Sequence, residues 1–339
     1  MIGKTQQEDI LEFVQTFSMA KELAQSSFLI TGATGLIGSS LIRCLLALDK
    51  GIRIVALVRD TAKAKLMFDD MPGQVEWVEC DLMSYAYDQI DGIDYIVHCA
   101  APTSSRFFVD SPVETIRVIY EATSSLLDYS RRRRIKSFVY LSSLEVYGSG
   151  LAQAPITEKM QGYWDVMDVR SSYPVSKRVA ENLCYAYVSE FGVPVKVARL
   201  TQTTGAGIAK DDNRVIAQFT KMAVKGEDIV LHTTGESARP YCYTTDCVSA
   251  LLYILLKGKN GEAYNVANDN TYISARDMAE FLRDNFNPSI DVRVELNDNM
   301  GYAPVSKLNL STEKLRSLGW QPRYDLKQMF ERLIKYLSE

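Results

Sequence analysis

The sequence predicts an α/β protein with a doubly wound parallel sheet and a smaller C-terminal α/β lobe. From residue 28 onward, short apolar runs rich in β-branched residues alternate with longer segments of helical periodicity. This alternation is typical of βαβ units, whose strands run parallel. A chain of 339 residues, 47% of them hydrophobic, is long enough to bury one large core and an additional lobe. The expected strands are 28–31, 53–58, 75–79, 95–98, 138–141 and 195–200, with a late strand at 263–267.

The segments around these strands define three parts. Apolar side chains at helical spacing predict a helix over residues 8–24, which we interpret as part of an N-terminal helical appendage, residues 1–26. Residues 27–200 hold the predicted strands and form the sheet domain, to which the late strand returns. Residues 201–339 are expected to form a substrate-binding lobe that closes over the carboxyl ends of the strands. Its expected helices lie near 213–225, 244–257, 274–286 and 311–338.

Charge and cysteine usage argue against several function classes. A net charge of -4 does not suit a nucleic-acid partner, because the phosphate backbone calls for a basic stripe. We interpret the dense basic run 131–134 as the solvated end of a helix. Six scattered cysteines indicate reduced thiols, and with two histidines no metal site is expected. The chain shows no long apolar run and opens with polar residues, so we predict a cytoplasmic protein without a membrane span or signal peptide.

A glycine-rich turn follows the first strand. Residues 31–38 read Thr-Gly-Ala-Thr-Gly-Leu-Ile-Gly and lead into an apolar helix. Gly32 permits a tight turn, Gly35 lets the backbone approach a pyrophosphate, and Gly38 lets helix and strand pack closely. The helix N-terminus then faces the anion. The sequence therefore predicts a Rossmann-type dinucleotide site in residues 27–200. Its expected cofactor contacts are Gly32, Thr34, Gly35, Leu36, Ile37 and Gly38.

The end of the second strand bears on which dinucleotide binds. Arg59 and Asp60 follow residues 53–58. An acidic residue at this place binds both ribose hydroxyls, whereas an arginine suits a 2'-phosphate. Arg59 occupies the discriminating position, which favours NADP over NAD. The alternative is that Arg59 points to solvent and Asp60 serves the ribose.

Two further turns are expected to contact the cofactor. Asp81 and Leu82 follow the third strand and would flank the adenine. Ala100 and Ala101 follow the fourth strand and would line the cofactor with small side chains. Both pairs are also consistent with simple packing.

Tyr173 and Lys177 stand four residues apart, which places them on one face of a helix. The lysine cation, helped by oxidised nicotinamide, favours the phenolate, so the tyrosine can take a proton from a substrate hydroxyl near neutral pH. Lys177 would also hold the nicotinamide ribose. Ser142 and Ser143 lie about 30 residues upstream at the end of a predicted strand, where a hydroxyl can orient the reacting carbinol.

With these residues, the chain resembles the extended short-chain dehydrogenase/reductases of the nucleotide-sugar epimerase/dehydratase family, over nearly its whole length after residue 27. The matching motifs are the glycine turn, 142–148, the Tyr-x-x-x-Lys motif and 198–200. Within that family, residues 170–187, 213–215 and 238–240 look most like UDP-glucuronate decarboxylases. The resemblance implies a homodimer built on two long helices. It also implies catalytic roles for Ser143, Glu145, Tyr173 and Lys177, and nucleotide-diphosphate contacts for Arg214 and Arg239.

Two of these roles have physical alternatives. A guanidinium matches a diphosphate in charge and geometry, which supports Arg214 and Arg239. A surface salt bridge is the competing explanation for Arg239. Glu145 is either a general base beside Tyr173 or a buried structural acceptor.

Three positions on the substrate side depart from the family pattern. Leu144 stands immediately before the glutamate, where decarboxylases and dehydratases carry Ser or Asp. Their arginine close to the substrate carboxylate aligns with Tyr302, and the asparagine of their substrate-binding segment appears as Gln202. Because the cofactor side is nearly intact, we expect the same hydride chemistry on a different substrate.

The sequence thus predicts an NAD(P)-dependent oxidoreductase that transfers a hydride between nicotinamide and a nucleotide-linked sugar or polyol. Arg59 favours a net NADPH-dependent reduction, because an exchangeable reductant serves net turnover. The alternative is internal hydride return, as in an epimerase, a dehydratase or UDP-glucuronate decarboxylase. An alternative of another class is a non-catalytic dinucleotide sensor, against which Tyr173 and Lys177 in helical register argue.

Overall fold

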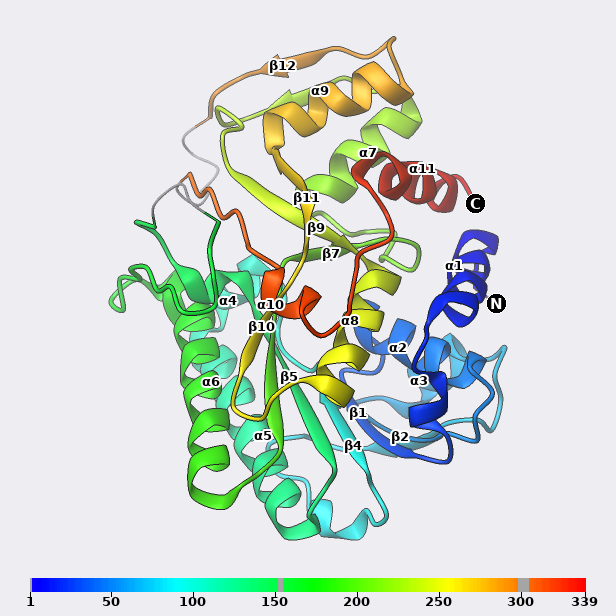
Figure 1. The fold of residues 1–339 in the computed structure, drawn as a ribbon. Helices are drawn as coiled ribbons and strands as arrows, with labels where there is room; N and C mark the ends of the chain where they lie inside the picture. The colour runs from blue at the N-terminus through cyan, green and yellow to red at the C-terminus, as the bar shows by residue number, and fades with distance from the viewer. Residues whose placement is uncertain (1, 152–154, 298–304) are drawn as a thin grey trace.

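A seven-stranded parallel sheet forms the centre of the computed structural model, which describes residues 2–151, 155–297 and 305–339 (Figure 1). The strand order is β10-β6-β5-β4-β1-β2-β3, so the chain winds outward from β1 in both directions. This order confirms the predicted doubly wound α/β fold. The strands are β1 (Ser27–Thr31), β2 (Arg53–Val58), β3 (Glu76–Glu79), β4 (Tyr95–His98), β5 (Ser137–Ser143), β6 (Val195–Leu200) and β10 (Ala263–Val266).

Helices cover both faces of this sheet, which explains why its central strands are mostly apolar rather than alternating. In β1, Phe28 and Ile30 belong to the core on one face, and Leu29 belongs to the core on the other. Successive side chains of a strand point to opposite faces, so one continuous apolar run supplies both cores. The covering helices are α2 (Leu36–Ala47) and α8 (Thr244–Lys257) on the first face, and α5 (Pro112–Arg133) and α6 (Ser172–Phe191) on the second.

The C-terminal lobe has its own core and two small sheets, and lies beyond the carboxyl ends of the central strands (Figure 1). The three-stranded sheet has the order β11-β9-β7, and β12 pairs with β8. β10 leaves this part of the chain and pairs with β6, as predicted for the late strand. The elements are β7 (Gln202–Thr204), α7 (Val215–Lys225), β8 (Ile229–Leu231), β9 (Ala238–Tyr243), β11 (Asn268–Ser274), α9 (Ala275–Phe286), β12 (Val292–Val294) and α11 (Leu326–Leu337).

The N-terminal helix α1 (Lys4–Thr16) begins earlier than expected and ends before the short 3-10 helix η1 (Ala20–Leu23). It packs against α2 and α8 of the sheet domain and against α11 of the C-terminal lobe. Asp9 lies at this junction, where its carboxylate accepts hydrogen bonds from Arg332 and from the Tyr243 hydroxyl. The helix therefore joins the two parts of the fold.

The helix predicted over 311–338 is wrong as one element. The structure has α10 (Glu313–Arg316) and α11, separated by a linker. Gly319 adopts a left-handed φ of 96°, and Pro322 further along cannot continue a helix. The Trp320 side chain from this linker is buried, and its Nε1 donates to Ser249 Oγ at 2.9 Å. Because the linker places this indole against α8, it does not continue as a helix.

The basic run is the end of a helix, as predicted. α5 ends at Arg133, and Arg134 adopts a left-handed φ of 52° as its C-cap. Arg132 and Arg133 form ion pairs with Asp88 and Asp91. Throughout the described ranges, no helix combines the length and the apolar character needed to cross a membrane.

Candidate active site

The glycine turn leaves room for an anion at the N-terminus of α2. Gly32 has a φ of 65°, and a Cβ there would lie 2.7 Å from the backbone N of Ala100. A Cβ on Gly38 would lie 2.3 Å from the Gly32 carbonyl oxygen. At Gly35, in contrast, that carbonyl oxygen is the one near neighbour, at 3.3 Å. The turn is thus closed on its inner side and open beside the first N–H groups of α2, which have no intrahelical partners, and this shape fits a pyrophosphate.

At the end of β2, Arg59 is the cation that remains available to bind a cofactor. Its side chain is exposed, and among the described residues it has no hydrogen-bond or ion-pair partner. Asp60 is instead the N-cap of α3 (Thr61–Met67), where its Oδ1 accepts from Lys63 N at 2.9 Å. Asp60 therefore has a local structural role that the alternative assignment to the ribose did not foresee.

The turns after β3 and β4 lie at the same edge of the sheet. Asp81 accepts hydrogen bonds from Met83 N at 3.1 Å and from the Ser84 hydroxyl at 3.4 Å, which shapes the turn that includes Leu82. Ala100 N donates to Thr31 Oγ1 at 3.1 Å and packs directly on the glycine turn, followed by Ala101. Because parallel strands end at one edge, both turns face the opening beside the glycine turn. Their cofactor contacts stay predictions.

Tyr173 and Lys177 share one buried face of α6, as their spacing predicted. Lys177 Nζ donates to the Leu141 carbonyl oxygen at 2.7 Å and lies 5.8 Å from the centroid of the Tyr173 ring. Burial lowers the pKa of Lys177 to about 8, against the opposing charge of Glu181. The ammonium is therefore held beneath the end of β5, beside the phenol whose ionisation it would assist.

The last residues of β5 bring hydroxyls to the same place. Burial raises the pKa of the Tyr173 phenol, Glu145 raises it further, and a hydrogen bond with Ser143 and the charge of Arg170 lower it. The Ser143 hydroxyl is therefore one of the groups that influence the Tyr173 phenol. Ser142 Oγ is buried without a hydrogen-bond partner among the described residues. A buried hydroxyl of this kind calls for a partner that a ligand would supply.

Glu145 lies in the short 3-10 helix η3 (Leu144–Tyr147) that follows β5. Its Oε2 accepts a hydrogen bond from Arg170 at 2.9 Å, and both side chains are about one quarter exposed. Its neighbour Leu144 is buried among apolar side chains and offers no polar group to the site. Glu145 is thus neither free nor fully buried, and neither alternative for it accounted for the ion pair.

On the substrate side, Gln202 and Arg239 lie in one small sheet. Gln202 pairs in register with Tyr241, and Arg239 stands two residues before Tyr241 on β9. Registered neighbours and residues at i and i+2 share a face, so the three side chains lie on the same side. Gln202 Oε1 is buried without a hydrogen-bond partner, and Arg239 has no hydrogen-bond or ion-pair partner within the described ranges. The salt bridge considered for Arg239 is not found there.

Arg214 differs from Arg239 because it already has partners. Its guanidinium pairs with Asp212 in the same loop at 2.6 Å, and its NH1 donates to the Thr203 carbonyl oxygen at 2.7 Å. Burial raises the pKa of the Tyr241 hydroxyl, and the charges of Arg239 and Arg214 both lower it. A ligand contact from Arg214 would have to compete with Asp212. Tyr302, which aligns with the arginine of the related decarboxylases, lies outside the described residues.

Two residues near Tyr173 were missed by sequence reasoning. Phe108, on α4 (Ser105–Asp110), stacks on the Tyr173 ring with centroids 4.2 Å apart. Arg170 lies in the 3-10 helix η4 (Val169–Ser171), directly before α6. The position of Arg170, three residues before Tyr173, was the one available signal for it. Phe108 had no local signal, because its contact comes from another part of the chain.

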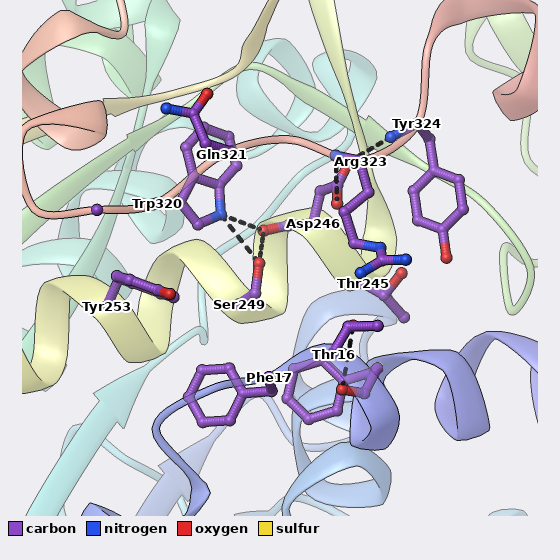
Figure 2. Close-up of a pocket in the computed structure, with 12 residues that line it drawn as sticks. Thr16, Phe17, Thr245, Asp246, Ser249, Tyr253, Trp320, Gln321, Arg323 and Tyr324 are labelled. Carbon is purple, nitrogen blue, oxygen red and sulfur yellow. Dashed lines mark hydrogen bonds between the residues drawn. The ribbon is translucent and has the colours of Figure 1, made fainter.

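A separate cavity of about 220 Å³ lies away from these residues, between α1, α8 and the linker before α11 (Figure 2). Figure 2 shows the Trp320 indole directed toward Ser249 on α8, and Asp246 directed toward the linker. The buried Asp246 carboxylate accepts from the backbone N–H groups of Arg323 and Tyr324. Burial raises the pKa of Asp246 to about 7, against these hydrogen bonds. Its contacts thus hold the linker to α8.

The chain belongs to the NAD dependent epimerase/dehydratase family, whose sequence pattern matches residues 28–267. It is therefore an enzyme of that family, as the resemblance in its motifs predicted, and the alternative of a non-catalytic sensor is wrong. The family is NAD-dependent, and its members act on nucleotide sugars.

Particular relatives are UDP-glucuronic acid decarboxylases and nucleotide-sugar epimerases. UDP-glucuronic acid decarboxylase 6 of Arabidopsis thaliana is 30% identical over 301 residues, which cover 88% of this chain and 85% of the relative. A structure of UDP-glucose 4-epimerase from Thermotoga maritima with UDP-glucose has a TM-score of 0.79 at 21% identity, covering 92% of this chain and 98% of the epimerase. UDP-glucuronic acid 4-epimerase from Bacillus cereus, in complex with UDP-glucuronic acid and NAD, has a TM-score of 0.78 at 20% identity, covering 92% and 99%. At these identities the two structures establish the fold.

Proposed function

We propose that this enzyme transiently oxidises one carbinol of a nucleotide-linked sugar and returns the hydride to the same substrate. The observation that carries this proposal is the gathering of Ser143, Tyr173 and Lys177 at the carboxyl end of β5. Epimerases and decarboxylases among the relatives favour internal return over the net reduction that Arg59 suggested. The site is thus assigned to the alternative mechanism.

Each residue has a role that follows from its position. A nicotinamide dinucleotide held by the glycine turn and Lys177 would supply the hydride acceptor at its C4. Tyr173 takes the hydroxyl proton of the carbinol as the carbonyl forms and returns a proton in the reverse step. Lys177 stabilises the phenolate because its charge lies beside the ring. Ser143 hydrogen-bonds the reacting oxygen and keeps it within reach of the phenol.

The proposed substrate carries a nucleoside diphosphate. Arg239 supports this, because it lies on the same face of the small sheet as Gln202 and has no hydrogen-bond or ion-pair partner among the described residues. A guanidinium forms bidentate hydrogen bonds to a phosphate. Arg214 contributes positive charge at the same place while it stays bound to Asp212. The polyol alternative has no comparable support.

A second candidate is a preference for NADP, with the net reduction that it would serve. Arg59 favours it, because this exposed cation stands at the end of β2 while Asp60 caps α3. A 2'-phosphate would be bound by such an arginine. Such a preference would be specific to this chain, because the family is described as NAD-dependent.

We also propose a homodimer formed through α5 and α6. Ile116, Tyr120 and Val179 on these adjacent helices are 43% to 47% exposed, although their side chains are apolar. They line a hollow of about 180 Å³ on that face. Exposed apolar side chains that gather on one surface are typical of protein contacts. Sedimentation of the Val179→Glu variant against the parent tests this, and a monomeric parent would contradict it.

Isotope transfer tests the function directly. The protein is incubated with UDP-sugars and dTDP-sugars deuterated at the carbinol carbons, together with a small amount of NAD or NADP. Internal return keeps the deuterium in the sugar product and needs no cofactor turnover. Net redox chemistry moves the deuterium to released cofactor and stops when the cofactor is consumed. If the parent protein, in which Tyr173 is intact, leaves every sugar unchanged, the proposal is overturned.

A further inference from the structure

Arg170 connects three side chains around the phenol of Tyr173. Its NH2 donates to Glu145 Oε2 at 2.9 Å, and its guanidinium carbon lies 5.0 Å from the centroid of the Phe108 ring. Phe108 in turn stacks on Tyr173 with an interplanar angle of 7°. Asp168 Oδ1 accepts from Arg170 N at 2.9 Å, which fixes the backbone of η4 where it enters α6. Arg170 is thus held at the entrance to the catalytic helix.

Arg170 makes fewer hydrogen bonds than expected of a residue that only connects η3 to η4. Its NH1 is buried without a hydrogen-bond partner among the described residues. An unmet buried donor costs free energy, so an arginine selected only to join η3 and η4 would be expected to use it. The guanidinium thus pairs with Glu145 through NH2, while its NH1 has no partner among the described residues.

The charges of the pair act on Tyr173 in opposite directions. Glu145 raises the pKa of the phenol and Arg170 lowers it, both beside the larger effect of burial. The other groups facing the phenol are Ser143 and Tyr140 from β5 and Lys177 from α6. His98 on β4 adds no charge, because burial lowers its pKa to about 3. A substitution of Glu145 or Arg170 can therefore change the net charge that acts on the phenol while the other groups stay in place.

We propose that Arg170 is a positioning residue that holds the Glu145 carboxylate and compensates its charge beside Tyr173, so that the phenol can give up its proton. Glu145 then acts as a fixed carboxylate bound to Arg170 instead of as a general base. This inference rests on the proposed function, in which Tyr173 is the acid/base. It adds a requirement that the Tyr-x-x-x-Lys motif does not contain.

The test measures the ionisation of Tyr173 without turnover. Protein labelled with [13Cζ]tyrosine is titrated by NMR with bound NAD, and the Tyr173→Phe variant identifies the resonance. In Arg170→Gln the phenol should titrate higher, by on the order of one pH unit, because the carboxylate is left uncompensated. The double variant Arg170→Gln/Glu145→Gln should titrate near the parent. Arg170→Lys keeps the charge and should shift it less than Arg170→Gln.

A matched control is available in α4. Arg106 pairs with Asp110 and its side chain is 90% exposed, so Arg106→Gln removes the same charge without touching the phenol. An equal shift in Arg106→Gln, a double variant no closer to the parent than Arg170→Gln, or a Tyr173 resonance that does not titrate in the parent would overturn the inference. Because no substrate is used, inactivity toward every nucleotide sugar would count against the proposed function alone.

Discussion

The ring of Phe108 lies parallel to the ring of Tyr173, with centroids 4.2 Å apart and an interplanar angle of 7°. The Ser172 hydroxyl also donates to the Phe108 carbonyl oxygen at 2.9 Å. These contacts join α4 to the first turn of α6. The plane of the phenol is therefore set by a residue outside the catalytic motif.

Phe108→Ala should both destabilise the protein and slow the reaction. Phe108 is 2% exposed, and emptying such a site typically costs about 3–5 kcal/mol of unfolding free energy. The loss of the stack also frees the phenol ring, so kcat should fall. Urea unfolding and turnover at saturating substrate measure the two effects. Phe107→Ala is the control, because Phe107 is 37% exposed, and an equal loss in both variants would contradict the assigned contact.

Tyr173→Phe should abolish turnover and leave dinucleotide affinity nearly unchanged. The substitution removes the transferable proton and keeps the ring that stacks on Phe108. General acid/base groups are typically worth about 10²–10⁴ in rate. Steady-state rates and dinucleotide titrations check both parts. Full activity in this variant would exclude the mechanism.

Arg59→Asp should shift the preference from NADP(H) toward NAD(H). The exposed guanidinium would be lost, and a carboxylate able to accept from the ribose hydroxyls would take its place. Both cofactors are titrated against both proteins, with Arg53→Gln as a control for charge on the same strand. A parent that already binds NAD about tenfold more tightly, or 1.4 kcal/mol, would show that Arg59 does not select the cofactor.

The enzyme should not decarboxylate UDP-glucuronate at an appreciable rate, despite its relatives. That reaction needs a site for the substrate carboxylate, and an arginine contact would typically contribute about 1.5–3 kcal/mol. Leu144 is buried and apolar, and Tyr302 replaces the arginine in the sequence. Lys307, a cation nearby in the chain, has Glu236 at 3.7 Å. Steady release of CO₂ and UDP-pentose from purified protein would refute this prediction.

Asp9→Ala should destabilise the junction between the two parts of the fold. Asp9 is 2% exposed, and its loss leaves the Tyr243 hydroxyl without its acceptor, whereas Arg332 keeps its ion pair with Glu12. Leaving a buried polar group without its hydrogen-bond partner typically costs about 1–3 kcal/mol. Glu8→Ala is the control on the same helix, because Glu8 pairs with Lys335 at the surface. Equal unfolding midpoints for Asp9→Ala and the parent would show that this junction contributes little.

The central sheet and the two local motifs could be predicted from the sequence alone. Runs such as 53–58 and 195–200 became β2 and β6 with the predicted bounds. The glycine turn and the Tyr173–Lys177 spacing also needed no distant information. Each of these features depends on backbone geometry within a few residues, so it is visible in a short window of sequence.

The contacts between side chains of the site could not be predicted in this way. Phe108 contacts the segment 64 residues later, and Arg170 pairs with a carboxylate 25 residues earlier. The tertiary structure also distinguishes Arg214, which is bound to Asp212, from Arg239, which is not. Such contacts follow from how strands and helices pack, and the same local sequence is compatible with many partners. Side-chain partners at a site are therefore set by packing across the whole fold.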